Sequence, residues 1–104
     1  MKPSSPMFVI LTSKPGQFRT EAGEGLRPME SWDYQLCGRL KAHFVIAEID
    51  RAVKVTVVDE TPPEVVNHIP SKFLPSFASV EEARREIAQL ARSGDADNVV
   101  VRRS

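Results

Sequence analysis

Two runs of β-forming residues near the middle of the chain constrain its fold most. Lys41–Ile49 (KAHFVIAEI) and Val53–Glu60 (VKVTVVDE) are rich in β-branched and aromatic side chains, and only three residues separate them. A connection this short typically joins two antiparallel strands into a hairpin. The register that gathers the apolar side chains on one face also places His43 opposite Asp59. The sequence therefore predicts a hairpin with one buried face.

Four further short segments have the composition of strands: Met7–Thr12, Gln17–Ala22, Glu64–Ile69 and Val99–Val101. Residues 14–17 (KPGQ) separate the first two, with proline and glycine at the central positions of a type II turn. We weighed a phosphate-cradling loop at Lys14 and Gly16, but a second glycine and the GK[ST] ending of a P-loop are missing. The KPGQ segment is therefore interpreted as a hairpin turn.

The segment Gly23–Ser31 (GEGLRPMES) contains two glycines and a proline and has no clear hydrophobic period. It is interpreted as a loop of about nine residues, which is longer than most connections in small domains. Two roles remain open for it: a covering loop that packs Leu26 and Met29 onto the core, or part of a functional site.

The C-terminal quarter carries the clearest helix signal. Ser79 and Glu82 form a capping box, and apolar residues follow at helical spacing on one stripe: Val80, Ala83, Ile87, Leu90 and Ala91. The expected fold is an α+β domain in β-β-β-β-β-α-β order. A mostly antiparallel sheet of about four to six strands is covered on one face by this helix. We expect residues 1–104 to form a single domain in which residues 1–6 are a loose tail.

Charge and length limit the classes of function. The chain has 14 basic and 14 acidic residues, so it lacks the basic excess typical of duplex-binding proteins. Its longest apolar run, Met7–Leu11, is far shorter than the roughly 20 residues that span a bilayer. The N-terminus does not resemble a secretory signal, and a single cysteine forms no internal disulfide. These features predict a cytoplasmic protein.

The stretch CGRLKAHF places Cys37, Arg39, Lys41 and His43 on alternate residues of one predicted strand. A Cys37–His43 dyad fails on distance, because six residues of extended chain span roughly 20 Å. His43 and Asp59 form a better candidate pair, either as a structural hydrogen bond or as part of a site. Arg39, Lys41 and His43 would then form a basic strip that recognises phosphates or carboxylates, although a solvated strand face explains the same pattern.

Trp32 and Tyr34 lie shortly before this strip. They are interpreted either as stacking residues beside it or as core anchors. The soft-metal ligands are Cys37, His43 and His68, and their spacing matches no zinc motif. No metal site or cofactor is therefore expected.

Two longer stretches carry a resemblance to known proteins: FVILTSKPGQFRTE at Phe8–Glu21 and VVNHIPSKFLPSFASVEEARREI at Val65–Ile87. They resemble small bacterial proteins of about this length, some of which carry a ferredoxin label. The label implies an iron–sulfur cluster, but such a cluster takes four cysteine ligands, or two cysteines and two histidines. One cysteine and two histidines do not suffice, so no iron site is expected.

These observations favour a small non-enzymatic binding or accessory protein. The expected surface consists of Arg39, Lys41, His43, Trp32 and Asp59, and another protein is the expected partner. Binding of nucleic acid or a phosphorylated small molecule on the same strip is the alternative. An enzyme that uses His43 and Asp59 is a third hypothesis, and an exposed edge strand would also permit a homodimer.

Overall fold

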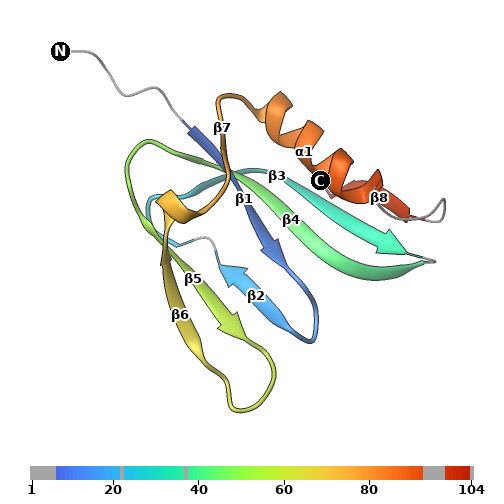
Figure 1. Cartoon of the computed structure of the whole chain (residues 1–104), viewed down its shortest axis with the longest axis horizontal. Helices are drawn as coiled ribbons and strands as arrows, with labels where there is room; N and C mark the ends of the chain where they lie inside the picture. The colour runs from blue at the N-terminus through green and yellow to red at the C-terminus, as the bar shows by residue number, and fades with distance from the viewer. Residues whose placement is uncertain (1–6, 22, 37, 93–97, 104) are drawn as a thin grey trace.

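The structure, a computed structural model, describes residues 7–21, 23–36, 38–92 and 98–103. It confirms an α+β fold of antiparallel strands with one C-terminal helix (Figure 1). The predicted tail at residues 1–6 lies outside the described residues. The elements within them are β1 (Met7–Ser13), β2 (Phe18–Glu21), β3 (Arg27–Leu36), β4 (Arg39–Ile49), β5 (Lys54–Asp59), β6 (Val66–Pro70), the 3-10 helix η1 (Ser71–Phe73), β7 (Ser76–Phe77), α1 (Val80–Arg92) and β8 (Asn98–Arg103).

The strands divide between two antiparallel sheets instead of forming one. A five-stranded sheet has the order β7-β1-β4-β3-β8, and a three-stranded sheet has the order β2-β5-β6. The two sheets diverge from each other, and α1 lies over the five-stranded one (Figure 1). The last strand, β8, pairs antiparallel with β3.

The predicted hairpin between the two central strands is wrong. β4 pairs with β1 and β3, whereas β5 pairs with β2 and β6, so residues 50–53 carry the chain from one sheet to the other. Asp59 lies opposite Phe18, and it does not face His43. The physical reason is that β4 is apolar on both faces. A hairpin with one buried face leaves half of these side chains in water, whereas a central strand between a helix and a second sheet buries both halves.

The segment predicted as a loop, Gly23–Ser31, is mostly strand. β3 begins at Arg27 and runs for ten residues between β4 and β8. Pro28 and Glu30 pair with successive residues of β4, which leaves Met29 as the extra residue of a β-bulge. This bulge interrupts the alternation of side chains, and the interruption hides the strand in the sequence.

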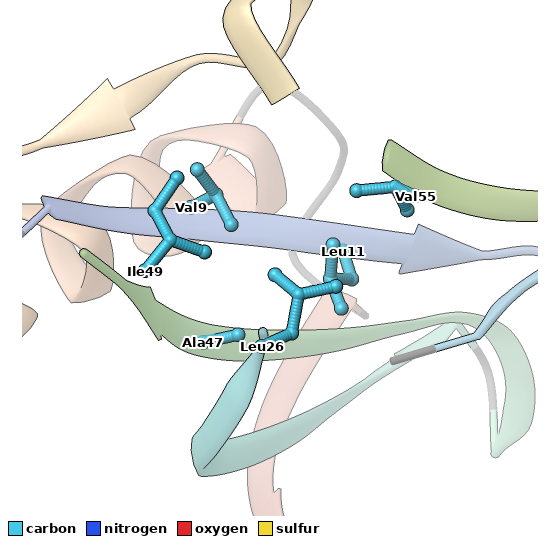
Figure 2. Close-up of a cluster of buried hydrophobic side chains, with 6 residues drawn as sticks. All are labelled: Val9, Leu11, Leu26, Ala47, Ile49 and Val55. Carbon is cyan, nitrogen blue, oxygen red and sulfur yellow. The ribbon is translucent and has the colours of Figure 1, made fainter. Parts of the chain in front are cut away.

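Two buried clusters occupy the two faces of the five-stranded sheet. The cluster between the sheets comprises Val9, Leu11, Leu26, Ala47, Ile49 and Val55 (Figure 2). The cluster beneath α1 comprises Ile10, Ala42, Phe44, Ile46, Ala83 and Ile87. β1 and β4 contribute to both clusters on alternate residues, which makes them the centre of the fold.

Ser79 caps the start of α1 as predicted, but the reciprocal bond of the capping box goes to Ala78, one residue before the N-cap. The backbone N–H of Glu82 donates to Ser79 Oγ at 3.1 Å, and the Glu82 carboxylate accepts the N–H of Ala78 at 2.9 Å. Ala83 and Ile87 are buried as expected, but Leu90 is 47% exposed. None of the helices in the described part of the chain is long and apolar enough to cross a membrane.

The predicted turn at residues 14–17 is confirmed, but the predicted hairpin is wrong, because β1 and β2 belong to different sheets and only an isolated bridge between Lys14 and Phe18 links the two sides of the turn. Gly16 has a φ of +81°, and the N–H of Gln17 donates to the Lys14 carbonyl at 2.9 Å. A positive φ at the third position is the defining feature of a type II turn. The turn connects β1 in one sheet to β2 in the other, and it fixes the backbone of Lys14 at the point where the sheets diverge.

Candidate functional site

A cleft of about 540 Å³ opens between the five-stranded sheet, the KPGQ turn and the C-terminal half of α1. We call it the lysine cleft. The described residues that line it are Thr12, Lys14, Gln17, Tyr34, Lys41, Ala42, Phe44 and Leu90. They come from β1, β3, β4, α1 and the turn, so the cleft is a product of the tertiary fold and not of a local motif.

Lys14 and Lys41 give the lysine cleft its charge. Both are exposed, and neither takes part in an ion pair between described residues. The described lining contains no carboxylate that would neutralise them. Two ammonium groups, one from the KPGQ turn and one from β4, therefore border one cleft without an ion-pair partner among the described residues.

A β-bulge explains how Lys41 comes to line this cleft. Tyr34 pairs with Ala42 and Gln35 pairs with Leu40, so Lys41 is the extra residue on β4. Bulges re-aim side chains relative to the regular alternation of a strand. The predicted row of three cations on one face is therefore interrupted at Lys41, and His43 belongs to a different environment.

His43 is paired with Asp33 instead of Asp59. Its Nδ1 lies 2.8 Å from Asp33 Oδ1 across the β3–β4 pair, and the two side chains are 23% and 14% exposed. Asp59 lies in the other sheet, where its carboxylate accepts the N–H of Thr61 at 3.0 Å. The partner was missed because no strand was predicted over the segment that contains Asp33: the first half of β3 was interpreted as the end of a loop, Gly23–Ser31. The structure therefore does not form the His43–Asp59 pair on which the enzyme hypothesis depends.

Trp32 is a packing residue. It lies against the buried cluster beneath α1, and its Nε1–H donates to Glu30 Oε1 at 3.1 Å. The Glu30 side chain is only 6% exposed, and Arg84 of α1 binds both of its oxygens, one of them through Nε at 2.9 Å. The hydrogen bond to Glu30 raises the pKa of Arg84 above its ordinary value. The contacts among Trp32, Glu30 and Arg84 connect α1 to strand β3 of the sheet.

The remaining candidates do not extend the site. Arg39 is exposed at the start of β4 and does not line the lysine cleft. Cys37 lies outside the described residues. Within the described ranges, no group of three or more histidine, cysteine, aspartate or glutamate side chains is arranged to hold a metal ion.

Strand β6 is an edge of the three-stranded sheet, and both its first residue, Val66, and the preceding Val65 are exposed. Such an edge fits the predicted homodimer, which stays a prediction.

Of the predicted surface Arg39, Lys41, His43, Trp32 and Asp59, Lys41 alone belongs to the described lining of the lysine cleft. Tyr34, weighed as a stacking residue, and Lys14, weighed as a phosphate ligand, also line it, and the structure adds Gln17 and Phe44. The cleft combines positive charge with aromatic and aliphatic walls, which suits an organic anion. Comparison of the chain with protein-family models, curated proteins and solved structures gives no significant match.

Proposed function

We propose that this protein binds a small organic anion in the lysine cleft. A phosphate or carboxylate group lies between Lys14 and Lys41, and its apolar substituent packs on Tyr34, Phe44 and Leu90. The observation that carries the proposal is the convergence on one apolar-walled cleft of two lysines that form no ion pair with a described residue. We keep the cytoplasmic location expected from the sequence as part of the proposal.

The size and chemistry of the cleft support this class of ligand. A volume of about 540 Å³ falls within the range of small-molecule sites, which runs from roughly 300 to 1,000 Å³. Gln17 and Tyr34 supply neutral hydrogen-bonding groups beside the two ammonium groups. Most of such a pocket is apolar, and a few polar groups fix the orientation of the ligand.

The protein partner predicted for the basic strip stays a prediction, but the structure gives it less support. The strip is interrupted at the bulge, and His43 is held by Asp33. Trp32 packs against the core, which removes the stacking residue that a single-stranded nucleic acid would use. A small anion can bind to Lys14 and Lys41 without a contribution from His43 or Trp32.

Isothermal titration calorimetry with phenyl phosphate tests the proposal. We expect saturable binding that weakens at least about fivefold when either Lys14 or Lys41 is changed to glutamine, because a charged hydrogen bond contributes more than 1 kcal/mol. Raising the salt concentration weakens binding as well. Arg39→Gln is the matched control, since it removes an exposed cation outside the cleft.

Absence of saturable binding of phenyl phosphate by the wild-type protein would contradict the proposal. So would an equal loss in Arg39→Gln and Lys41→Gln, because that result assigns the effect to overall charge.

A further inference from the structure

A second cleft, of about 460 Å³, shares Thr12 and Leu90 with the first and is lined mostly by aliphatic side chains, together with Phe18, Thr20 and Glu86. We call it the aliphatic cleft. Its walls include Ile10 of β1, Val57 of β5, Ile69 of β6 and Leu74 in the segment before β7, and Glu86 of α1 is the charged residue among its described lining. It therefore lies where the two sheets and the helix meet.

The termination of an edge strand explains why this space exists. β7 pairs with β1 only at Phe8 and Val9 and is preceded by Pro75, which has no N–H to continue the ladder. Beyond Val9, the three consecutive residues Ile10–Thr12 all line the aliphatic cleft. Consecutive residues of a strand point to opposite faces, so the cleft runs along the edge of β1 itself.

The two clefts are contiguous. Thr12 and Leu90 line both of them. Along the chain, Ile10 in the aliphatic cleft and Lys14 at the lysine cleft are four residues apart, which is roughly 13 Å of extended backbone. A linear molecule of that length reaches from the two lysines, past Leu90, into the aliphatic walls.

We infer that the ligand is an amphiphilic anion, namely an alkyl phosphate or alkyl carboxylate whose chain enters the aliphatic cleft between Thr12 and Leu90. The inference rests on the proposed function and adds the chemical class of the ligand. Charge sets the orientation: Lys14 and Lys41 attract the oxyanion to the lysine cleft, and Glu86 disfavours it in the aliphatic cleft. The aliphatic lining favours a flexible chain over a polar or second anionic group.

A chain-length series tests this inference. Binding of alkyl phosphates from ethyl to decyl is measured by calorimetry below their micelle concentrations. We expect affinity to rise about fourfold for each methylene that enters the aliphatic cleft, and then to level off when the cleft is full. Affinity that does not depend on chain length overturns the inference.

Substitutions in the aliphatic cleft test whether the alkyl chain of the ligand binds there. Val57→Gln places an amide in the aliphatic cleft and is expected to weaken decyl phosphate at least tenfold while it changes ethyl phosphate less than twofold. Val66→Gln is the matched control, because Val66 is 53% exposed on the neighbouring strand and lines neither cleft. Leu90→Trp supplies a second test at an exposed position that lines both clefts, and it is expected to obstruct the passage and to weaken decyl phosphate more than ethyl phosphate. Circular dichroism melting checks that each variant is folded.

The outcomes separate the two proposals. The alkyl-chain inference is overturned, and the proposed function stands, if phenyl and ethyl phosphate bind in a lysine-dependent way but the affinity for alkyl phosphates does not respond to chain length, to Val57→Gln or to Leu90→Trp. Failure of every alkyl and phenyl phosphate to bind overturns both.

Discussion

The replacement of Ile87 by alanine should destabilise the protein far more than the same replacement at Leu90, one turn further along α1. Ile87 is 1% exposed and belongs to the cluster beneath the helix, whereas Leu90 is 47% exposed at the clefts. Ile87→Ala removes three buried carbons, each contributing about 0.8 kcal/mol, and leaves a cavity that adds to the loss. We expect a decrease of about 2–4 kcal/mol in the free energy of unfolding.

Leu90→Ala removes as many carbons from a position that is half exposed already. Alanine also has the higher helix propensity, which offsets part of the loss, so we expect a decrease below about 1 kcal/mol. Urea denaturation followed by circular dichroism measures both variants. With a urea dependence of about 1–3 kcal/mol per molar for a small domain, the two midpoints should differ by roughly 1 M.

Equal losses at the two positions would refute this account of how α1 packs. Because Leu90→Ala leaves the fold intact, it also lets the role of Leu90 in ligand binding be measured separately from stability.

Three further substitutions test individual contacts by the same urea assay. Gly25 has a φ of +87°, and a Cβ there would lie 2.6 Å from Val53 Cγ1, so Gly25→Ala should cost about 1–3 kcal/mol, whereas Gly23→Ala, with open space around it, should not destabilise. Ser79→Ala removes the N-cap of α1 and should cost about 1 kcal/mol. Arg84→Met should lower the urea midpoint and Arg85→Met should not, because Arg84 forms an ion pair with the buried Glu30 carboxylate, whereas Arg85 forms none with a described residue. The pKa of Arg84 is raised, so its contribution is present at all lower pH and lost only under strongly alkaline conditions; the Arg84→Met effect should therefore be constant around neutral pH. Three results would contradict these expectations. Gly23→Ala could lower the urea midpoint as much as Gly25→Ala, Ser79→Ala could leave it unchanged, or the effect of Arg84→Met could vary around neutral pH.

Features encoded over a few neighbouring residues were predictable from the sequence. The helix cap at Ser79 and the turn at Gly16 depend on local hydrogen bonds and backbone angles, and both occur where the sequence places them. The β-forming composition of Lys41–Ile49 likewise identified β4. In each case the determining contacts lie within the segment itself.

Features that depend on distant partners were not predictable in the same way. The hairpin prediction assumed one buried face for β4, and only the second sheet shows that both faces are covered. The bulge at Met29 removed the alternation that would have revealed β3, and with β3 missing, Asp33 was not available as the partner of His43. The bulge at Lys41 likewise interrupts the regular alternation of side chains, so the predicted basic strip of Arg39, Lys41 and His43 does not form one continuous row.

The lysine cleft combines features that were predictable from local sequence with features that depend on distant partners. Lys41 was chosen for its charge, but as part of a strip that the bulge interrupts. Lys14 was weighed as a phosphate ligand within a loop motif and then assigned to a turn. The turn is correct, and it also carries Lys14 to the cleft, because it joins strands from two diverging sheets.

The central claim is that Lys14 and Lys41 hold an organic anion against the apolar walls of one cleft. Chemical-shift mapping by heteronuclear NMR during a titration with phenyl phosphate tests it most directly. We predict that the signals of Ala42, Phe44 and Leu90 shift along one common saturation curve, and that these shifts disappear in the Lys14→Gln/Lys41→Gln double variant. Unchanged signals at these three residues, or shifts that persist in the double variant, would contradict the claim.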